Sequence, residues 1–219
     1  MSPIALLVVV AAACGGGGTT APTVIPPAGP PVAPVYLVRN GKLAPVARAV
    51  PARDRAHLLE ALSQGPLPFE RQAGFVAAAS GDTRLRLAEQ VFTLTALHPK
   101  EAVTIDGKRY TRSDFEAETP VILVESPLPF AHVKSPLQVS GTANTFEATF
   151  DYDLLDASGK ILAHHFVTAT SGTGQRGTFT FTARFKIKYG QRGKLVVYEE
   201  SAKDGSRIHQ SDIPLTLEP

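Results

Sequence analysis

The stretch LQVSGTANTFEATFDYDLLD, residues 137–156, decides the fold of the second half of the chain. Hydrophobic residues occupy every second position from 146 onward, and the hydrophobic set is Phe146, Ala148, Phe150, Tyr152 and Leu154. The intervening set is Glu147, Thr149, Asp151 and Asp153. Because successive side chains of a strand point to opposite faces, this alternation predicts a strand over 145–155 with one buried and one solvated face. The stretch holds no nucleophile–base pair and no metal-ligand spacing, so we interpret it as framework.

Similar signals flank this strand on both sides. Further strands are expected over 121–125, 137–141, 161–169, 178–187, 194–199 and 208–217. About seven strands at short spacing, with turn residues between them and no helix signal, are typical of an antiparallel β-sandwich. We therefore predict an all-β immunoglobulin-like sandwich over residues 118–219. The chain has one Cys and no Trp, so the disulfide and core Trp of antibody domains are absent and packing alone must stabilise this domain.

Five blocks of this half resemble one family in the right order. They are 133–143 (VKSPLQVSGTA), 146–149 (FEAT), 156–162 (DASGKIL), 177–179 (GTF) and 198–206 (YEESAKDGS). These blocks are similar to the immunoglobulin-like domain of bacterial spore germination. The resemblance implies a role in the cell envelope and, in spore-forming bacteria, in sporulation or germination.

The first half has a mixed pattern over residues 35–116. Strands are expected over 35–39, 43–50, 74–79 and 102–105, and helices over 54–64 and from 82 to about 97. Asp54 is a typical N-cap, and Gly65-Pro66 is a typical helix end. This order predicts a small α/β layer with its helices on one face, so the whole chain is of the α+β class. The helix over 54–64 could instead bind a partner, but its plain Leu spacing favours a core helix.

The same region resembles a second family. The residues involved are Tyr36-Leu37, the run LAPVAR at 43–48, LEAL at 59–62 before Gly65-Pro66, LAEQVFTLT at 87–95 and VTIDG at 103–107. They are similar to the GerMN domain of sporulation and germination proteins, which resembles ring-building modules of secretion-like complexes. Between Pro66 and Gly74 this chain is shorter than the family, which indicates a reduced domain or an open sheet edge.

The first 34 residues are predicted to be a targeting segment and a tether rather than a folded domain. Residues 4–13 are an apolar run, too short for a stable anchor, which needs about 20 residues. The run ends in Ala11-Ala12-Ala13-Cys14, which resembles a bacterial lipobox, so we predict a signal peptide over 1–13 and a lipid on Cys14. The alternative is an ordinary secretory leader with an incidental cysteine. Residues 14–34 are rich in Gly and Pro and are expected to form an extended tether.

Candidate chemical groups are sparse. The net charge is +2 with scattered basic residues, which argues against nucleic-acid binding. Adjacent His164 and His165 would point to opposite faces of a strand and could not share one metal ion, while His132 and His209 are isolated. The carboxylates at 147, 151, 153, 199, 200 and 204 could gather around Ca²⁺, but no EF-hand-like loop is present. We expect Glu147 and Glu199 to make structural hydrogen bonds to a neighbouring turn.

One glycine pattern resembles a nucleotide-binding motif. Gly172 to Gly177 fits G-x-G-x-x-G, but it lies between two strands rather than before a helix, so the nucleotide interpretation fails. No catalytic residue, cofactor or metal is therefore expected.

These features predict a non-catalytic lipoprotein exported to the bacterial envelope and anchored through Cys14. Its expected role is to bind or assemble other envelope proteins, with self-association as one form of this role. The sandwich would present loops or an edge strand. The alternative is recognition of cell-wall glycan by residues 118–219. A third hypothesis is an enzyme that acts on the cell wall, and its only support is the scattered His and carboxylate residues.

Overall fold

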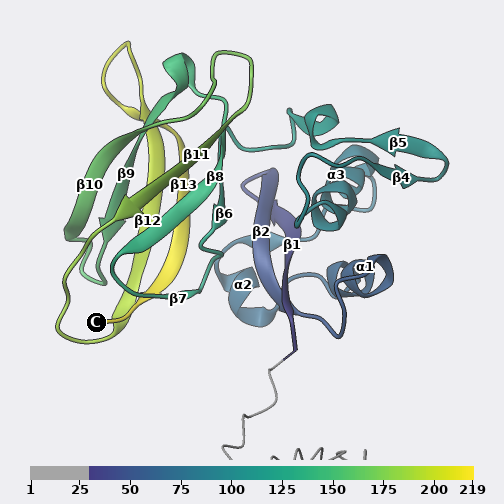
Figure 1. The fold of residues 1–219 in the computed structure, drawn as a ribbon, viewed down its shortest axis with the longest axis horizontal. Coiled ribbons are helices and arrows are strands. Elements are labelled where there is room, and N and C mark those ends of the chain that lie inside the picture. Colours follow the sequence, from purple (N-terminus) through teal and green to yellow (C-terminus); the bar gives the residue numbers. More distant parts are fainter. Residues whose placement is uncertain (1–29) are drawn as a thin grey trace, which may run out of the picture.

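A computed structural model describes residues 30–219 (Figure 1). The expected signal peptide, the lipidation site Cys14 and most of the tether lie outside these residues. The tether was expected to continue to residue 34, but the first strand already begins at Val32, and Ala33 is fully buried. The reason is pairing, because Val32 to Pro34 lie opposite Ala47 to Ala49 of the next strand.

The first half is a small α/β domain. Its elements are β1 (Val32–Arg39), β2 (Lys42–Ala49), α1 (Arg55–Ser63), α2 (Pro68–Gln72), β3 (Phe75–Val76), α3 (Thr83–Leu94), β4 (Val103–Ile105), β5 (Lys108–Tyr110) and the 3-10 turn η1 (Arg112–Phe115). The sheet has the order β2-β1-β3, and β4 and β5 form a separate hairpin. Figure 1 shows α1 and α3 beside the β1–β2 hairpin, on the side away from the second domain. The side chains of Asp54 and Asp82 cap α1 and α3 by accepting from His57 N and Leu85 N.

Two hydrophobic clusters meet at β1. Tyr36 and Val38 belong to a cluster with the buried face of α3, whereas Val35 and Leu37 pack in a second cluster with α1 and Phe75. Alternate residues of β1 therefore serve different clusters, as the period of a strand requires. Both sides of this strand are buried, which explains its nearly continuous apolar sequence.

Three elements of this domain were not expected from the sequence, namely α2, β5 and the 3-10 turn η1. The short segment 66–74 holds the helix α2, and its Glu70 is buried. The second unexpected element is β5, which pairs with β4 across Asp106-Gly107. The helix α3 ends three residues earlier than expected. There the Arg112 guanidinium donates to the carbonyl oxygens of Phe92 and Thr95 at 3.3 and 3.2 Å. These hydrogen bonds satisfy carbonyl groups at the end of the helix that have no partner within the helix.

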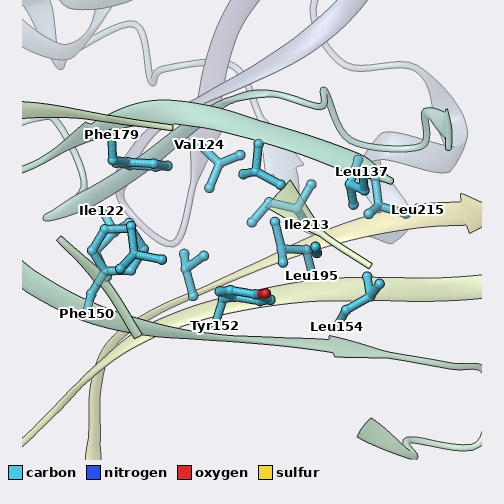
Figure 2. Packing of buried hydrophobic residues seen from close by; sticks show 14 of the residues in the cluster. Ile122, Val124, Leu137, Phe150, Tyr152, Leu154, Phe179, Leu195, Ile213 and Leu215 are labelled. Atoms are coloured by element: carbon cyan, nitrogen blue, oxygen red, sulfur yellow. The ribbon is translucent and has the colours of Figure 1, made fainter. Parts of the chain in front are cut away.

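The second half is a sandwich of a five-stranded and a three-stranded sheet. Its strands are β6 (Ile122–Ser126), β7 (His132–Val133), β8 (Leu137–Ala143), β9 (Thr149–Leu155), β10 (Ile161–Thr168), β11 (Gly177–Ala183), β12 (Gln191–Glu200) and β13 (Arg207–Leu217). The sheet orders are β10-β9-β12-β13-β7 and β11-β8-β6. All pairs are antiparallel except β13 with the short β7. Figure 2 shows the core between the sheets, with Phe150, Tyr152 and Leu154 of β9 facing Val124, Leu137 and Phe179.

The start of β9 differs from the expected strand. The 3-10 turn η2 (Phe146–Ala148) precedes it, with Glu147 and Ala148 at φ values of +53° and +59°. Phe146 is 64 % exposed and does not belong to the buried face. The hydrogen bond from Phe146 N to Glu199 holds this turn, so local alternation is overridden by a contact 53 residues away.

The strand β6 connects the two domains. Ile122 and Val124 lie in the sandwich core, while Leu123 between them lies in the cluster of α3. A single strand therefore contributes to the cores of both domains. We conclude that the two domains share part of their hydrophobic core and are not joined only by a linker.

Polar contacts reinforce this junction. The Tyr36 hydroxyl donates to Glu125 Oε1 of β6 at 2.5 Å, and Arg112 Nη1 donates to the same oxygen at 2.6 Å. The guanidinium of Arg112 also lies over the Phe92 ring, 4.6 Å from its centroid. Burial raises the pKa of Tyr36, so its hydroxyl stays protonated and keeps this hydrogen bond.

Glu89 in α3 gives a testable pH dependence. It is 6 % exposed, and its Oε1 accepts a hydrogen bond from Ala78 N at 2.9 Å. Burial raises the pKa of Glu89 to about 7 from an ordinary 4.5, so the folded chain binds this proton more tightly than the unfolded chain. Stability is therefore lost as the pH rises from about 4.5 to about 7, by up to about 3 kcal/mol.

Glu89→Gln should consequently stabilise the protein more at pH 8 than at pH 4, because the amide can still accept from Ala78 N and carries no charge. Thermal unfolding of both proteins at the two pH values measures this difference. Glu60→Gln, on an exposed side chain of α1 that makes no ion pair within residues 30–219, is the control and should show no such difference. An equal shift of the melting temperature at both pH values would contradict the prediction.

Candidate functional site

The structure places the histidines and carboxylates in separate pairs. His132 Nδ1 lies 2.8 Å from Glu218, His164 Nδ1 lies 2.8 Å from Asp153, and His209 Nδ1 lies 2.5 Å from Glu199. Among residues 30–219, no group of three His, Cys, Asp or Glu side chains is arranged to hold a metal ion. The hydrogen bonds found for histidine rings in this part of the chain go to carboxylates or to backbone and not to Ser or Thr hydroxyls.

Asp153 was expected on a solvated face, and this was wrong. Its side chain is 2 % exposed, and its two oxygens bind His164 of β10 and Arg207 of β13. The Arg207 guanidinium also lies over the Tyr198 ring, 3.8 Å from its centroid. The strand β9 is covered because it lies inside the sheet, where long side chains from neighbouring strands reach across it. Asp151 is only partly covered, and burial together with nearby Glu200 raises its pKa.

The expected structural role of Glu199 is confirmed. Its Oε1 accepts from Phe146 N at 2.8 Å, so it holds the turn before β9. Glu147 is different, because it is exposed and only its backbone N–H is bonded, to Thr173 Oγ1 at 3.1 Å.

The segment 172–177 is a structural loop. Arg176 within it binds Glu116 of the interdomain segment with Nε and Nη2, both at 2.9 Å.

The strand β10 combines an edge position with two exposed apolar side chains. It lies at the end of the five-stranded sheet and pairs only with β9 among the described strands (Figure 1). Phe166 is 61 % exposed and Ile161 is 52 % exposed. The strand contains no Lys, Arg, Asp, Glu or Pro, which are the residues that usually protect an edge.

The hydrogen-bond pattern shows that this edge is open. Phe166 N donates to the ring Nδ1 of its own neighbour His165 at 2.9 Å and not to β9, so this N–H points outward. In an antiparallel ladder the N–H groups of every second residue share a direction, so that of His164 also points outward. Just beyond the end of β10 the same edge meets β11, because Thr170 N donates to Thr178 O and Thr178 N donates to Thr170 Oγ1. The open part of the edge is therefore the part around His164 and Phe166.

Comparison with known proteins bears on the sandwich. A family model for the immunoglobulin-like domain of bacterial spore germination matches residues 121–206. The match confirms the resemblance seen in the sequence blocks, and the matching family is related to spore germination. The resemblance of residues 35–116 to GerMN stays a prediction.

Two further comparisons add little. No curated protein matches the chain. One solved structure, the crystal structure of CopC from Methylosinus trichosporium OB3b, is similar at 20 % identity over 43 % of this chain and 88 % of that chain, with a TM-score of 0.27. A TM-score of 0.27 is too low to indicate a shared fold or function. In the described part of the chain, no helix is long and apolar enough to cross a membrane.

Proposed function

We propose that the chain is a non-catalytic lipoprotein of the bacterial envelope that binds other envelope proteins through the open edge of β10. The observation that carries the binding role is the unprotected edge, with its outward N–H groups and two exposed apolar side chains. An extended segment of a partner can add a strand to such an edge, where main-chain hydrogen bonds supply affinity and exposed side chains supply selectivity. Export and anchoring through Cys14 are part of the proposal and come from the sequence pattern.

The junction around β6 supports an assembly role. Because both cores share this strand, a partner bound at β10 is held in a defined orientation to the α/β domain. The α/β domain would then make the second set of contacts, as its resemblance to GerMN implies. A pair of domains held in this way suits a protein that brings envelope components together.

Phe166→Lys should reduce partner binding at least tenfold, because a lysine on an edge strand disfavours strand addition and removes the exposed aromatic contact. The measurement is cross-linking in cells that express the full chain, followed by capture and mass spectrometry. The matched control is Tyr189→Lys, which changes an aromatic residue 80 % exposed outside the strands.

Partners captured by the wild type and by Tyr189→Lys, and lost with Phe166→Lys, would support the proposal. Equal capture by all three proteins would overturn it. Recovery of cell-wall fragments alone would favour the glycan-binding alternative.

A further inference from the structure

A cavity of about 200 Å³ lies at the interdomain junction. Its walls come from the β1–β2 turn, from Phe75, from Pro120 to Val124 and from the middle of β13. Much of this lining is apolar, including Leu43, Pro45, Val121 and Ile213. Compared with about 30 Å³ for one water molecule and several hundred Å³ for a typical ligand pocket, this space suits one or two small groups.

Among residues 30–219, Arg39 at this cavity makes no direct ion pair, and the carboxylate that acts on it electrostatically is that of Asp212. Five Lys or Arg residues in the range 30–219 are buried or half-buried, namely Arg39, Arg48, Arg112, Arg176 and Lys194. Four of them form ion pairs, with Glu70, Glu125, Glu116 and Asp212 respectively. Arg39 instead donates from Nε to Ala73 O at 2.9 Å and from Nη1 to Asp212 O. Since partly buried cations are usually paired, this exception indicates a place for an anion.

The surroundings of Arg39 point to the same conclusion. Its guanidinium carbon lies 5.2 Å from the centroid of the Phe75 ring, and both residues line the cavity. Lys42 also lines the cavity, and its ammonium group donates only to Ala117 O at 2.5 Å. The one carboxylate of the lining, Asp212, is occupied by Lys194 Nζ at 2.6 Å and by Gln210 Nε2 at 2.8 Å. Two cations thus border an apolar space, and the one carboxylate near Arg39 is already bound directly by Lys194.

We infer that this cavity binds the free carboxylate of a peptide that ends in a small apolar residue. The carboxylate would lie against Arg39 and Lys42, because a guanidinium offers paired donors that match two carboxylate oxygens. The terminal side chain would occupy the apolar part beside Leu43 and Ile213. The site is separate from the β10 edge, so the inference does not depend on the proposed strand addition.

The test is isothermal titration of the full chain with two peptides, acetyl-Ala-Ala as the free acid and the same peptide as the amide. Because a charge-assisted pair is roughly twice as strong as a neutral hydrogen bond, the acid should bind at least about tenfold more tightly. A third peptide, ending in D-alanine as a free acid, distinguishes a wall-type terminus from a protein-type terminus.

Three variants locate the site. Arg39→Met should abolish the preference for the acid, and Arg39→Lys should keep part of it because the charge remains. Arg184→Met, an exposed arginine outside the cavity, should bind like the wild type. Circular dichroism confirms that each variant is folded.

An acid preference that disappears in Arg39→Met and persists in Arg184→Met would support the site. Equal affinity for acid and amide, no heat with any of the three peptides, or unchanged binding by a folded Arg39→Met protein would overturn it.

Discussion

Gly141→Ala is expected to lower the free energy of unfolding by about 3 kcal/mol or more, at the upper end of the range for overpacked cores. Gly141 lies in β8 directly beside β6. A Cβ atom at this position would lie 2.0 Å from the carbonyl oxygen of Leu123 and 2.9 Å from Phe179 Cζ. The first of these neighbours is backbone, so it can move only if β6 moves. The close approach of two strands, and not a special φ value, is what requires glycine here.

The expected effect is large because β6 contributes residues to the hydrophobic cores of both domains. Any displacement of Leu123 disturbs the cluster around α3, and the residues on either side of it disturb the sandwich core. Chemical unfolding followed by circular dichroism measures the loss. The matched control is Gly81→Ala, because a Cβ at Gly81 meets no atom within 4 Å, and its effect should stay within about 0.5 kcal/mol. A Gly141→Ala protein as stable as the control would contradict the close approach.

Glu70→Ala is expected to cost about 3–5 kcal/mol, because it leaves the charge of Arg48 buried without a partner. The two side chains are 5 % and 2 % exposed, and they form two parallel hydrogen bonds of 2.5 and 2.6 Å. Glu70 Oε2 also accepts from Leu67 N at 2.7 Å, which holds the start of α2. With about 2–4 °C per kcal/mol for a protein of this size, the melting temperature should fall by roughly 10 °C.

The double variant Arg48→Met with Glu70→Leu separates the charge from the packing. It removes both charges and should recover much of the lost stability, since apolar replacement of a buried ion pair is often nearly neutral. Glu101→Ala, whose side chain is 71 % exposed, is the surface control and should change the melting temperature little. If Glu70→Ala melts like the control, the pair does not stabilise the fold.

Local sequence patterns were sufficient for most of the framework. Alternation predicted the strands β8 to β13, and the capping residues Asp54 and Asp82 predicted the starts of α1 and α3. These features depend on neighbours within a few residues, so a single sequence contains them. The sequence blocks also predicted the similarity of residues 121–206 to the immunoglobulin-like domain of bacterial spore germination.

The errors share a physical cause. The turn at Phe146, the burial of Asp153 and the short helix α2 all depend on partners far along the chain, namely Glu199, Arg207 and Arg48. The residue pattern around 146–153 gives no indication of those distant partners. The only available signal for α2 was a Pro at its first turn and a Glu two positions later, which is too short a pattern to distinguish from a loop.

The two-part organisation and the β-sandwich could be predicted from the sequence, because hydrophobic period and turn residues are local properties. The folded structure was needed to show that β6 belongs to both cores, that β10 is an edge strand, and that Arg39 lies at a cavity between the domains. Each of these depends on which distant segments become neighbours, and that is set by the packing of whole domains rather than by any stretch of residues.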